Sequence, residues 1–243
     1  MVPQRGSRSC MVSGILKRGA PTYPSNPLSR LHTKPYHLSI SHFPCDSSPS
    51  SAAQHVPNMS MASPPRPEEY RFAPTSHVPN SRLPVLIYRG VLPDQPTAAS
   101  TREALEKNAW LEGGVFKTVY AHHFHSVTHE CYAVFHGSSR LLLGRGPVDD
   151  PGEGGVEVSL SRGDIIVLPA GVSHCSVSSE DEYEYVGLYP KGSPHWDNNF
   201  CKADAQETAE KAKVASSVPI PDYDPVYGKG GPLVDIWRRA IAT

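Results

Sequence analysis

The sequence has no long apolar run and no dominant sign of charge, and each absence excludes a class of partner. No segment approaches the roughly 18 consecutive apolar residues that a membrane-spanning helix needs. The formal net charge of −1 and the pI near 6.9 provide no basic surface for nucleic acid or for an anionic membrane. We therefore predict no nucleic-acid partner and no membrane partner.

The sequence also lacks any CxxC pair, and its cysteines are odd in number. The five cysteines are Cys10, Cys45, Cys131, Cys175 and Cys201. Scattered single cysteines are typical of reduced thiols inside the cell rather than of a disulfide framework. We therefore predict a cytoplasmic protein with reduced, unpaired thiols, of which Cys131 and Cys175 are interpreted as buried.

The first 60 residues have almost no acidic side chains and no helical or strand periodicity. They contain 12 Ser, 8 Pro, six Lys or Arg and a single acid, Asp46. Such a segment buries too little apolar surface to offset the entropy of ordering, so we predict disorder over residues 1–68. The composition also resembles a transit peptide, which would make the protein mitochondrial. The alternative, which the prolines favour, is a gene model that extends beyond a true start at Met59 or Met61.

From residue 69 onward, short β-branched and apolar segments alternate with turns rich in Gly, Pro, Asp and Ser. The predicted strands are 83–92, 115–125, 130–137, 139–144, 156–160, 164–169, 174–179 and 183–190. Many short strands at this spacing predict an all-β sandwich or barrel with a few short helices around it.

Two helices and the domain limits follow from the same reading. Ser100 and Glu103 have the spacing of a capping box and predict a helix over 100–108. A second helix is predicted over 202–217. We expect a barrel domain over residues 69–200, with the helix and turn-rich tail of residues 201–243 packed on it.

The stretch AHHFHSVTHECY, residues 121–132, has four histidines and a glutamate within nine positions. On an extended strand alternate side chains share a face, so His123 and His125 lie together and can bind one metal ion. His129 and Glu130 face opposite ways. The interior can therefore receive His123, His125 and one of these two.

A second motif, GDIIVLPAGVSH, places Gly163, Pro169, Gly171 and His174 at the spacing G-x5-P-x-G-x2-H. The proline ends a strand, the glycine permits a tight turn, and the histidine begins the next strand. Together with H-x-H-x4-E-x6-G over residues 123–137, it resembles the two motifs of the cupin superfamily, and in particular single-domain microbial cupins. The resemblance implies a double-stranded β-helix barrel of jelly-roll type.

The same resemblance implies one divalent metal bound by His123, His125, Glu130 and His174. The ligand set suits Fe, Mn, Ni, Co or Zn. The sequence departs from the cupin pattern at Lys117, which replaces a glycine, and at Ser178, which replaces an asparagine. Neither is a ligand position.

Three further residues are candidates for the substrate pocket. Tyr132 and Val134 follow Glu130 at period two and should line the same space, although a packed tyrosine is the simpler interpretation. His129 would replace Glu130 only if the preceding bend shifted the register by one residue. The tyrosines at 183, 185 and 189 are interpreted as core or interface, while Trp110 and Trp196 are candidates to cover the mouth of a barrel.

The ligand set predicts a metal-dependent oxygenase acting on a small organic molecule. The resemblance to cupins implies that Glu130 is also the catalytic general base. One alternative is a non-redox isomerase, decarboxylase or lyase, and another is a small-molecule-binding protein without turnover. By resemblance to cupins, the expected assembly is a homodimer.

Overall fold

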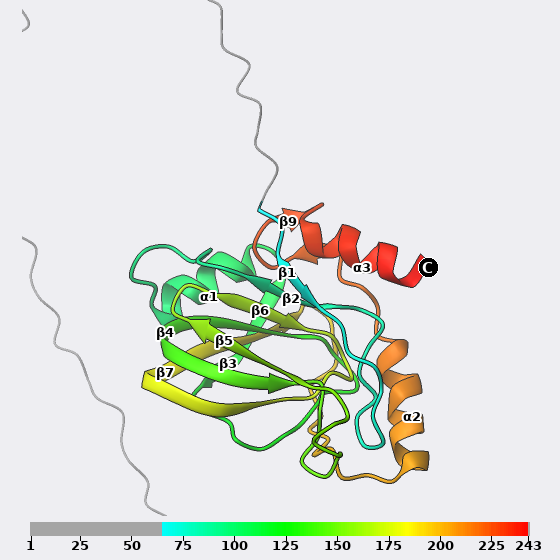
Figure 1. Cartoon of the computed structure of the whole chain (residues 1–243). Coiled ribbons are helices and arrows are strands. Elements are labelled where there is room, and N and C mark those ends of the chain that lie inside the picture. Colours follow the sequence, from blue (N-terminus) through cyan, green and yellow to red (C-terminus); the bar gives the residue numbers. More distant parts are fainter. Residues whose placement is uncertain (1–64, 243) are drawn as a thin grey trace, which may run out of the picture. The chain divides into compact units, whose positions relative to one another are not determined.

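The computed structural model describes residues 65–242, whose strands form an antiparallel sheet with short helices around it (Figure 1). The seven-stranded sheet has the order β1-β2-β6-β4-β7-β3, and β5 pairs with β4; β8 and β9 form a separate ribbon. The strands are β1 Glu68–Tyr70, β2 Val85–Tyr88, β3 Trp110–Phe116, β4 Glu130–Leu143, β5 Val156–Ser161, β6 Ile165–Leu168, β7 His174–Pro190, β8 Tyr223–Asp224 and β9 Gly228–Lys229. The helices are α1 Ala98–Glu106, α2 Ala205–Ser216 and α3 Pro232–Ala242. The predicted all-β fold class with a few short peripheral helices is confirmed, and the closed double-stranded β-helix barrel stays a prediction.

Two long strands, β4 and β7, form the centre of the sheet and pair with each other along most of their length. The sequence predicted each of them as two separate strands. The observed interruption is a bend within one strand, because Gly137 has a φ of +63° and Asp181 and Glu182 are also left-handed. A Cβ at Gly137 would lie 2.5 Å from two carbonyl oxygens of β7, so the bend requires glycine.

Successive side chains of β4 enter two different apolar clusters. Tyr132 and Val134 pack in a strand cluster, formed by residues of β2, β4, β5, β6 and β7 together with Val172. Cys131 and Ala133 pack in a helix cluster, which also contains residues of α1 and α3. Because both faces of β4 are covered, its side chains are apolar at successive positions rather than at alternate ones.

Helix α1 begins three residues earlier than the proposed capping box required. Its N-cap is Thr97, whose hydroxyl accepts the Ser100 N–H at 3.2 Å, while the Thr97 N–H donates to the Ser100 hydroxyl at 3.0 Å. Glu103 lies one turn further into the helix and forms an ion pair with Lys107. The predicted Ser100–Glu103 box is therefore wrong, since Ser100 is the third helical residue and not the cap.

The strand predicted over 115–125 is also wrong in its extent. Strand β3 begins at Trp110 and ends at Phe116, and residues 117–129 are irregular apart from two isolated bridges. These bridges join His123 to His174 and Phe124 to Asn199. The histidines of the first motif are therefore held by bridges to two other segments and not by a continuous strand.

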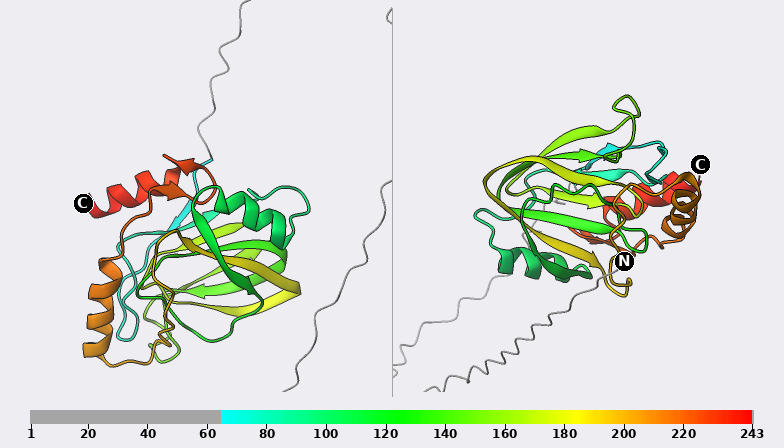
Figure 2. Two further views of the ribbon diagram at one scale, coloured as in Figure 1. Left: turned by 180° about the vertical axis from the view of Figure 1, so that it is seen from behind. Right: turned by 90° about the horizontal axis from the view of Figure 1, so that it is seen from below.

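Part of the predicted turn-rich tail is helix α3, which carries most of its apolar residues on one face. Leu233, Ile236, Trp237 and Ala240 are buried in the helix cluster, and the Trp237 indole N–H donates to the Pro84 carbonyl at 2.9 Å. Their spacing is that of an amphipathic helix, although the glycines and prolines before it suggested turns. Helices α2 and α3 lie on the same side of the strands in each view (Figure 2).

The predicted disordered segment, residues 1–68, lies almost entirely outside the described residues. The limits of the predicted barrel domain and C-terminal region, at residues 69, 200 and 243, stay predictions. The predicted helix over 202–217 is observed as α2. Within residues 65–242 no helix has the length and hydropathy needed to cross a bilayer.

Candidate metal centre

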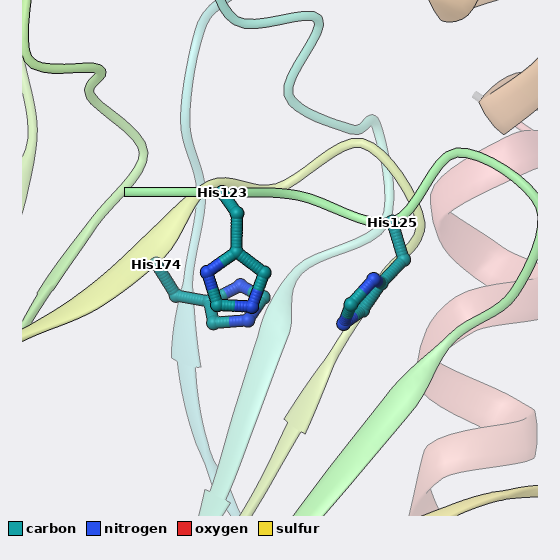
Figure 3. Close-up of side chains that lie close together, drawn as sticks. All are labelled: His123, His125 and His174. Carbon is teal, nitrogen blue, oxygen red and sulfur yellow. The ribbon is translucent and has the colours of Figure 1, made fainter. Parts of the chain in front are cut away.

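Three histidine side chains, His123, His125 and His174, point toward one another (Figure 3). His174 opens β7, whereas the other two lie in the irregular segment before β4. The N–H of His123 donates to the His174 carbonyl at 3.2 Å, and the N–H of His174 donates to the His123 carbonyl at 2.9 Å. The N–H of Gly171 donates to the His125 carbonyl at 2.8 Å. Backbone hydrogen bonds between the two motifs therefore bring the three side chains together.

Glycine is required in the turn that delivers His174. Gly171 has a φ of +89°, and a Cβ there would lie 2.6 Å from the carbonyl oxygen of Asn80. A side chain at this position would therefore be strained by its backbone conformation and would also collide with the neighbouring loop. The glycine of the second motif thus has a direct structural role.

In each of the three imidazoles, Nδ1 forms a hydrogen bond with a backbone carbonyl. The acceptors are the carbonyls of Ala121, at 2.9 Å from His123, of Asp197, at 2.5 Å from His125, and of Val172, at 3.1 Å from His174. A carbonyl oxygen can only accept, so each Nδ1 carries a proton, and in the neutral ring the lone pair is on Nε2. This is the arrangement that orients histidine ligands in metal sites.

The group is almost closed to solvent, with exposed fractions of 8% for His123, 4% for His125 and 2% for His174. One ligand atom from each residue lies within 4.8 Å of the others. Burial, together with the neighbouring His174, lowers the pKa of His123 to about 3. His123 is therefore neutral near pH 7, as a ligand must be.

Glu130, the first residue of β4, places one carboxylate oxygen against two of the histidines. Its Oε2 lies 2.9 Å from His125 Nε2 and 3.3 Å from His174 Nε2. Burial alone would raise the pKa of Glu130, but the two imidazoles outweigh it and the pKa is lowered. Burial likewise opposes protonation of His125, yet the Glu130 charge and hydrogen bond raise its pKa. A buried carboxylate that faces two imidazole nitrogens requires a proton or a cation between them.

The donors fit a metal ion by three independent features. The Nε2 of His174 is buried and has no hydrogen-bond partner within residues 65–242. Metal–ligand bonds of about 2.1 Å separate neighbouring ligand atoms by roughly 2.9 to 3.4 Å, and both distances to Glu130 Oε2 fall in this range. Three imidazoles with one carboxylate also suit a divalent first-row metal. The buried three-histidine group could therefore hold a metal ion.

Tyr189 contacts the same carboxylate, a role that the sequence did not reveal. Its hydroxyl donates to Glu130 Oε1 at 2.5 Å. Burial and the Glu130 charge raise the pKa of Tyr189, so the hydroxyl stays protonated and acts as a donor. The ring stacks on Trp196, with centroids 4.6 Å apart and planes at 6°. The interpretation of Tyr189 as simple core was incomplete.

Asp197 is a second residue that the sequence did not reveal. Its carbonyl orients His125, while its carboxylate accepts the Ser126 N–H at 2.7 Å and the Ser126 hydroxyl at 2.6 Å. The side chain of Asn199 donates to the same carboxylate at 2.7 Å. Burial opposes the charge on Asp197, but these hydrogen bonds lower its pKa to about 2. The segment after β7 is therefore tied to the segment that carries His125.

His129 is not brought to the three-histidine group. Its Nδ1 accepts the Ala170 N–H at 3.0 Å, and its Nε2 lies 3.3 Å from the Pro219 carbonyl. The ring packs on Trp237 of α3, with centroids 4.6 Å apart. Burial lowers the pKa of His129 to about 4. As the strand alternation predicted, His129 and Glu130 face opposite sides, and the alternative in which His129 replaces Glu130 is wrong.

The other predicted pocket residues differ in how close they come to the group. Tyr132 packs edge-on against His174, with centroids 5.6 Å apart, and stacks on Tyr185 at 3.9 Å. Val134 is fully buried in the strand cluster. Both are packed side chains, and Tyr132 is the one in contact with a histidine of the group.

The two candidate tryptophans also have different surroundings. Trp110 is fully buried and its indole N–H donates to the Tyr223 carbonyl, so it does not cover an opening. Trp196 is half-buried beside Tyr189 and Phe116. The described cysteines, Cys131, Cys175 and Cys201, are free thiols, as predicted, and all three are buried.

The space next to the group is narrow. It is bounded by His123, His174, Val119, Tyr132 and Tyr185, among others, and is too small to admit a free water molecule. A larger substrate would reach the donors only after these side chains or the neighbouring loops moved.

The antiparallel strands, with two motifs that bring three histidines together, define an all-β protein with a candidate metal centre, and the two motifs resemble those of cupins. The chain belongs to the same family as the protein named "Uncharacterized protein YjlB" of Bacillus subtilis (strain 168). The two are 32% identical over 175 residues, which cover 71% of this chain and 97% of that protein.

Two further comparisons add little. No family model matches the chain. Among solved structures, the vicilin from Solanum melongena matches with a TM-score of 0.26 and 18% identity, over 46% of this chain and 34% of that chain. The match thus spans about a third of the vicilin, and the fold class rests on this chain's own strands and motifs.

Proposed function

We propose that His123, His125, Glu130 and His174 bind one divalent metal ion, which is the functional centre of the protein. The observation that carries the proposal is the orientation of the donors. Three Nδ1–H groups are fixed on carbonyls, and Oε2 of a buried carboxylate lies against two of the remaining Nε2 atoms. Burying these polar groups together costs free energy unless a ligand compensates for it, so packing alone does not explain their arrangement.

The reaction that we propose is oxygenation of a small organic molecule. A divalent metal at this site supplies Lewis-acid polarisation and, if it is redox-active, reactivity toward dioxygen. The protein contributes three imidazoles, one carboxylate and a site from which bulk water is excluded. Glu130 is also our candidate for the general base, because it is the carboxylate in contact with the group.

Metal analysis of protein purified without a metal-affinity tag tests the proposal. We expect about one divalent ion per chain in the wild type and a strong loss of metal in His174→Ala. His122→Ala is the matched control, because His122 lies beside the ligands in sequence but directs its Nδ1 to the Arg145 carbonyl. Wild-type protein that neither retains nor takes up a divalent metal would falsify the proposed centre.

The oxygenase assignment needs a separate test. Nitric oxide, a surrogate for dioxygen, should bind the protein loaded with Fe(II) and give a new EPR signal. Retention of zinc, with no nitric oxide signal after loading with iron, would instead support the non-redox isomerase, decarboxylase or lyase alternative.

A second candidate is a binding protein whose metal is structural and supports no turnover, because the narrow space leaves no room for a substrate beside the donors. Glu130→Gln distinguishes the two once a substrate is known. In an enzyme it should abolish turnover, whereas in a binding protein it should only weaken metal affinity.

We further propose a small-molecule partner, a homodimer and a cytoplasmic location. Light scattering of the purified chain measures the assembly directly, and a monomer at micromolar concentration would contradict the dimer.

A further inference from the structure

The two oxygens of Glu130 have different partners. Oε2 faces His125 and His174, whereas Oε1 accepts the hydroxyl of Tyr189 at 2.5 Å. A free carboxylate can rotate and offer both oxygens to a metal ion. In this site Oε1 already accepts a hydrogen bond, and Oε2 is the oxygen that faces the histidines, so Oε2 is the one placed to bind the metal.

The position of Tyr189 follows from the pairing of the strands. Cys131 of β4 is opposite Leu188 of β7, so Glu130 and Tyr189 are one residue further along the same two strands. Side chains at such neighbouring positions share a face of the sheet. The hydroxyl therefore reaches the carboxylate through strand register and not through a flexible loop.

The Tyr189 ring is held from two sides. Trp196 stacks on it with nearly parallel planes, and Gly113 of β3 lies so close that a Cβ there would be 2.4 Å from the ring. A second glycine, Gly187, leaves room beside Phe116 and Glu130, because its Cβ would lie 2.7 Å from the Phe116 ring. The stacked indole and the close backbone at Gly113 thus hold the Tyr189 ring, and Gly187 leaves room for the carboxylate that the hydroxyl contacts.

We propose that Tyr189 is a positioning residue that holds Glu130 as a one-oxygen ligand of the metal centre. The inference rests on the proposed metal site. Its physical basis is that the hydroxyl satisfies the oxygen that would otherwise be buried without a partner. Partners that orient a ligand in this way commonly contribute 10- to 100-fold to metal affinity.

The same bond bears on the role of Glu130 in a reaction. Because the Tyr189 hydroxyl already donates to Oε1, a proton taken up by Glu130 as the proposed general base would go to Oε2, after that oxygen had left the metal.

The test compares Tyr189→Phe with Tyr183→Phe. Both tyrosines are on β7 and buried, but the Tyr183 hydroxyl has no hydrogen-bond partner within residues 65–242. We expect Tyr189→Phe to weaken Co(II) or Zn(II) binding about 10- to 100-fold in competition with a chelator, and Tyr183→Phe to change it less than about twofold. Melting in excess chelator should show that both variants fold.

A double-mutant cycle identifies the route of the effect. If Tyr189 acts through Glu130, the loss caused by Tyr189→Phe should vanish in a Glu130→Ala background. The visible spectrum of the Co(II)-loaded protein should also change in Tyr189→Phe and stay the same in Tyr183→Phe. If Tyr189→Phe does not fold, Trp196→Ala keeps the hydroxyl but loosens the ring and should give a smaller loss of affinity.

Failures of the two proposals are distinguishable. Wild-type protein without metal affinity would overturn the metal centre and this inference together. Wild-type binding with equal affinities in the two phenylalanine variants would overturn only the role of Tyr189. An undiminished effect of Tyr189→Phe in the Glu130→Ala background would also overturn it.

Discussion

His125 and His129 are four residues apart in the chain, and they have opposite surroundings. His125 gives one nitrogen to a carbonyl and turns the other toward Glu130, His123 and His174. Both ring nitrogens of His129 form hydrogen bonds with backbone groups, and the ring packs on Trp237. One histidine belongs to a buried group that could hold a metal ion, and both ring nitrogens of the other already have backbone partners.

The difference corresponds to the two faces of β4. The strand cluster lies on the side of Glu130 and the three-histidine group, while the helix cluster lies on the side of His129 and α3. Because the same strand contributes to both, a change on one face can be compared with a matched change on the other. We expect the helix face to determine stability without metal, and the Glu130 face to determine metal affinity.

The largest effect should come from the helix face. Trp237→Ala removes a fully buried indole and its hydrogen bond to Pro84, so it should cost about 3–5 kcal/mol of unfolding free energy. Urea denaturation in excess chelator measures this directly. Ile241→Ala is the control on the same helix, because Ile241 is 54% exposed and its removal should cost less than about 0.5 kcal/mol. Equal losses in the two variants would mean that α3 is not part of the core.

The next effect concerns the metal. A divalent ion at 100 times its dissociation constant should stabilise the folded protein by about 2.7 kcal/mol, if it binds only the folded state. His174→Ala should abolish this stabilisation, whereas Trp237→Ala should reduce stability and still respond to metal. Thermal unfolding with and without Zn(II) separates the two faces. A full metal response in His174→Ala would contradict the assignment of His174 as a ligand.

His129→Ala should have an intermediate effect on stability and none on metal binding. It leaves the Ala170 N–H buried without its acceptor, which costs about 1–3 kcal/mol. Chemical denaturation and a Zn(II) titration provide the two readouts. The exposed His136 of β4 provides the control, since His136→Ala removes an imidazole seven residues further along the chain at little cost.

The pH dependence of stability gives a further test of His129. Its pKa is lowered by burial from 6.5 to about 4 in the folded state, so the unfolded state binds more protons between these values. Stability contributed by the neutral form is therefore present above pH 6.5 and is lost as the pH falls toward 4. In chelator, the His129→Ala variant should lose less stability over this window than the wild type does.

The four proposed ligands could be predicted from the sequence because they lie in two short motifs. Strand alternation separated His129 from Glu130, and the proline and glycine before His174 indicated a turn. Each of these inferences depends on residues that are neighbours in the chain, where φ/ψ preferences and the period of two act directly.

Tyr189 and Asp197 could not be predicted in the same way. The Tyr189–Glu130 contact joins positions 59 residues apart and depends on the register of β4 with β7. Asp197 supports His125 through its backbone carbonyl, which every residue type has, so its identity carries no signal for that contact. Helix α3 was missed because the turn-forming residues before it outweighed an apolar pattern of only three turns.

The smallest predicted effect tests how far the centre extends beyond the sheet. Lys211 of α2 lies 3.6 Å from the Asp197 carboxylate, and both side chains are about one third exposed. A partly exposed ion pair of this kind contributes at most about 1 kcal/mol to the free energy of unfolding, because water screens the charges and the lysine loses side-chain entropy. Lys211→Met should therefore change stability by less than about 0.5 kcal/mol and leave Zn(II) affinity within twofold of the wild type.

Asp197→Ala keeps the carbonyl that orients His125 but loses the contacts to Ser126, so its effect on affinity should be larger. If Lys211→Met weakened the metal as much as Asp197→Ala does, α2 would have to be counted as part of the metal centre.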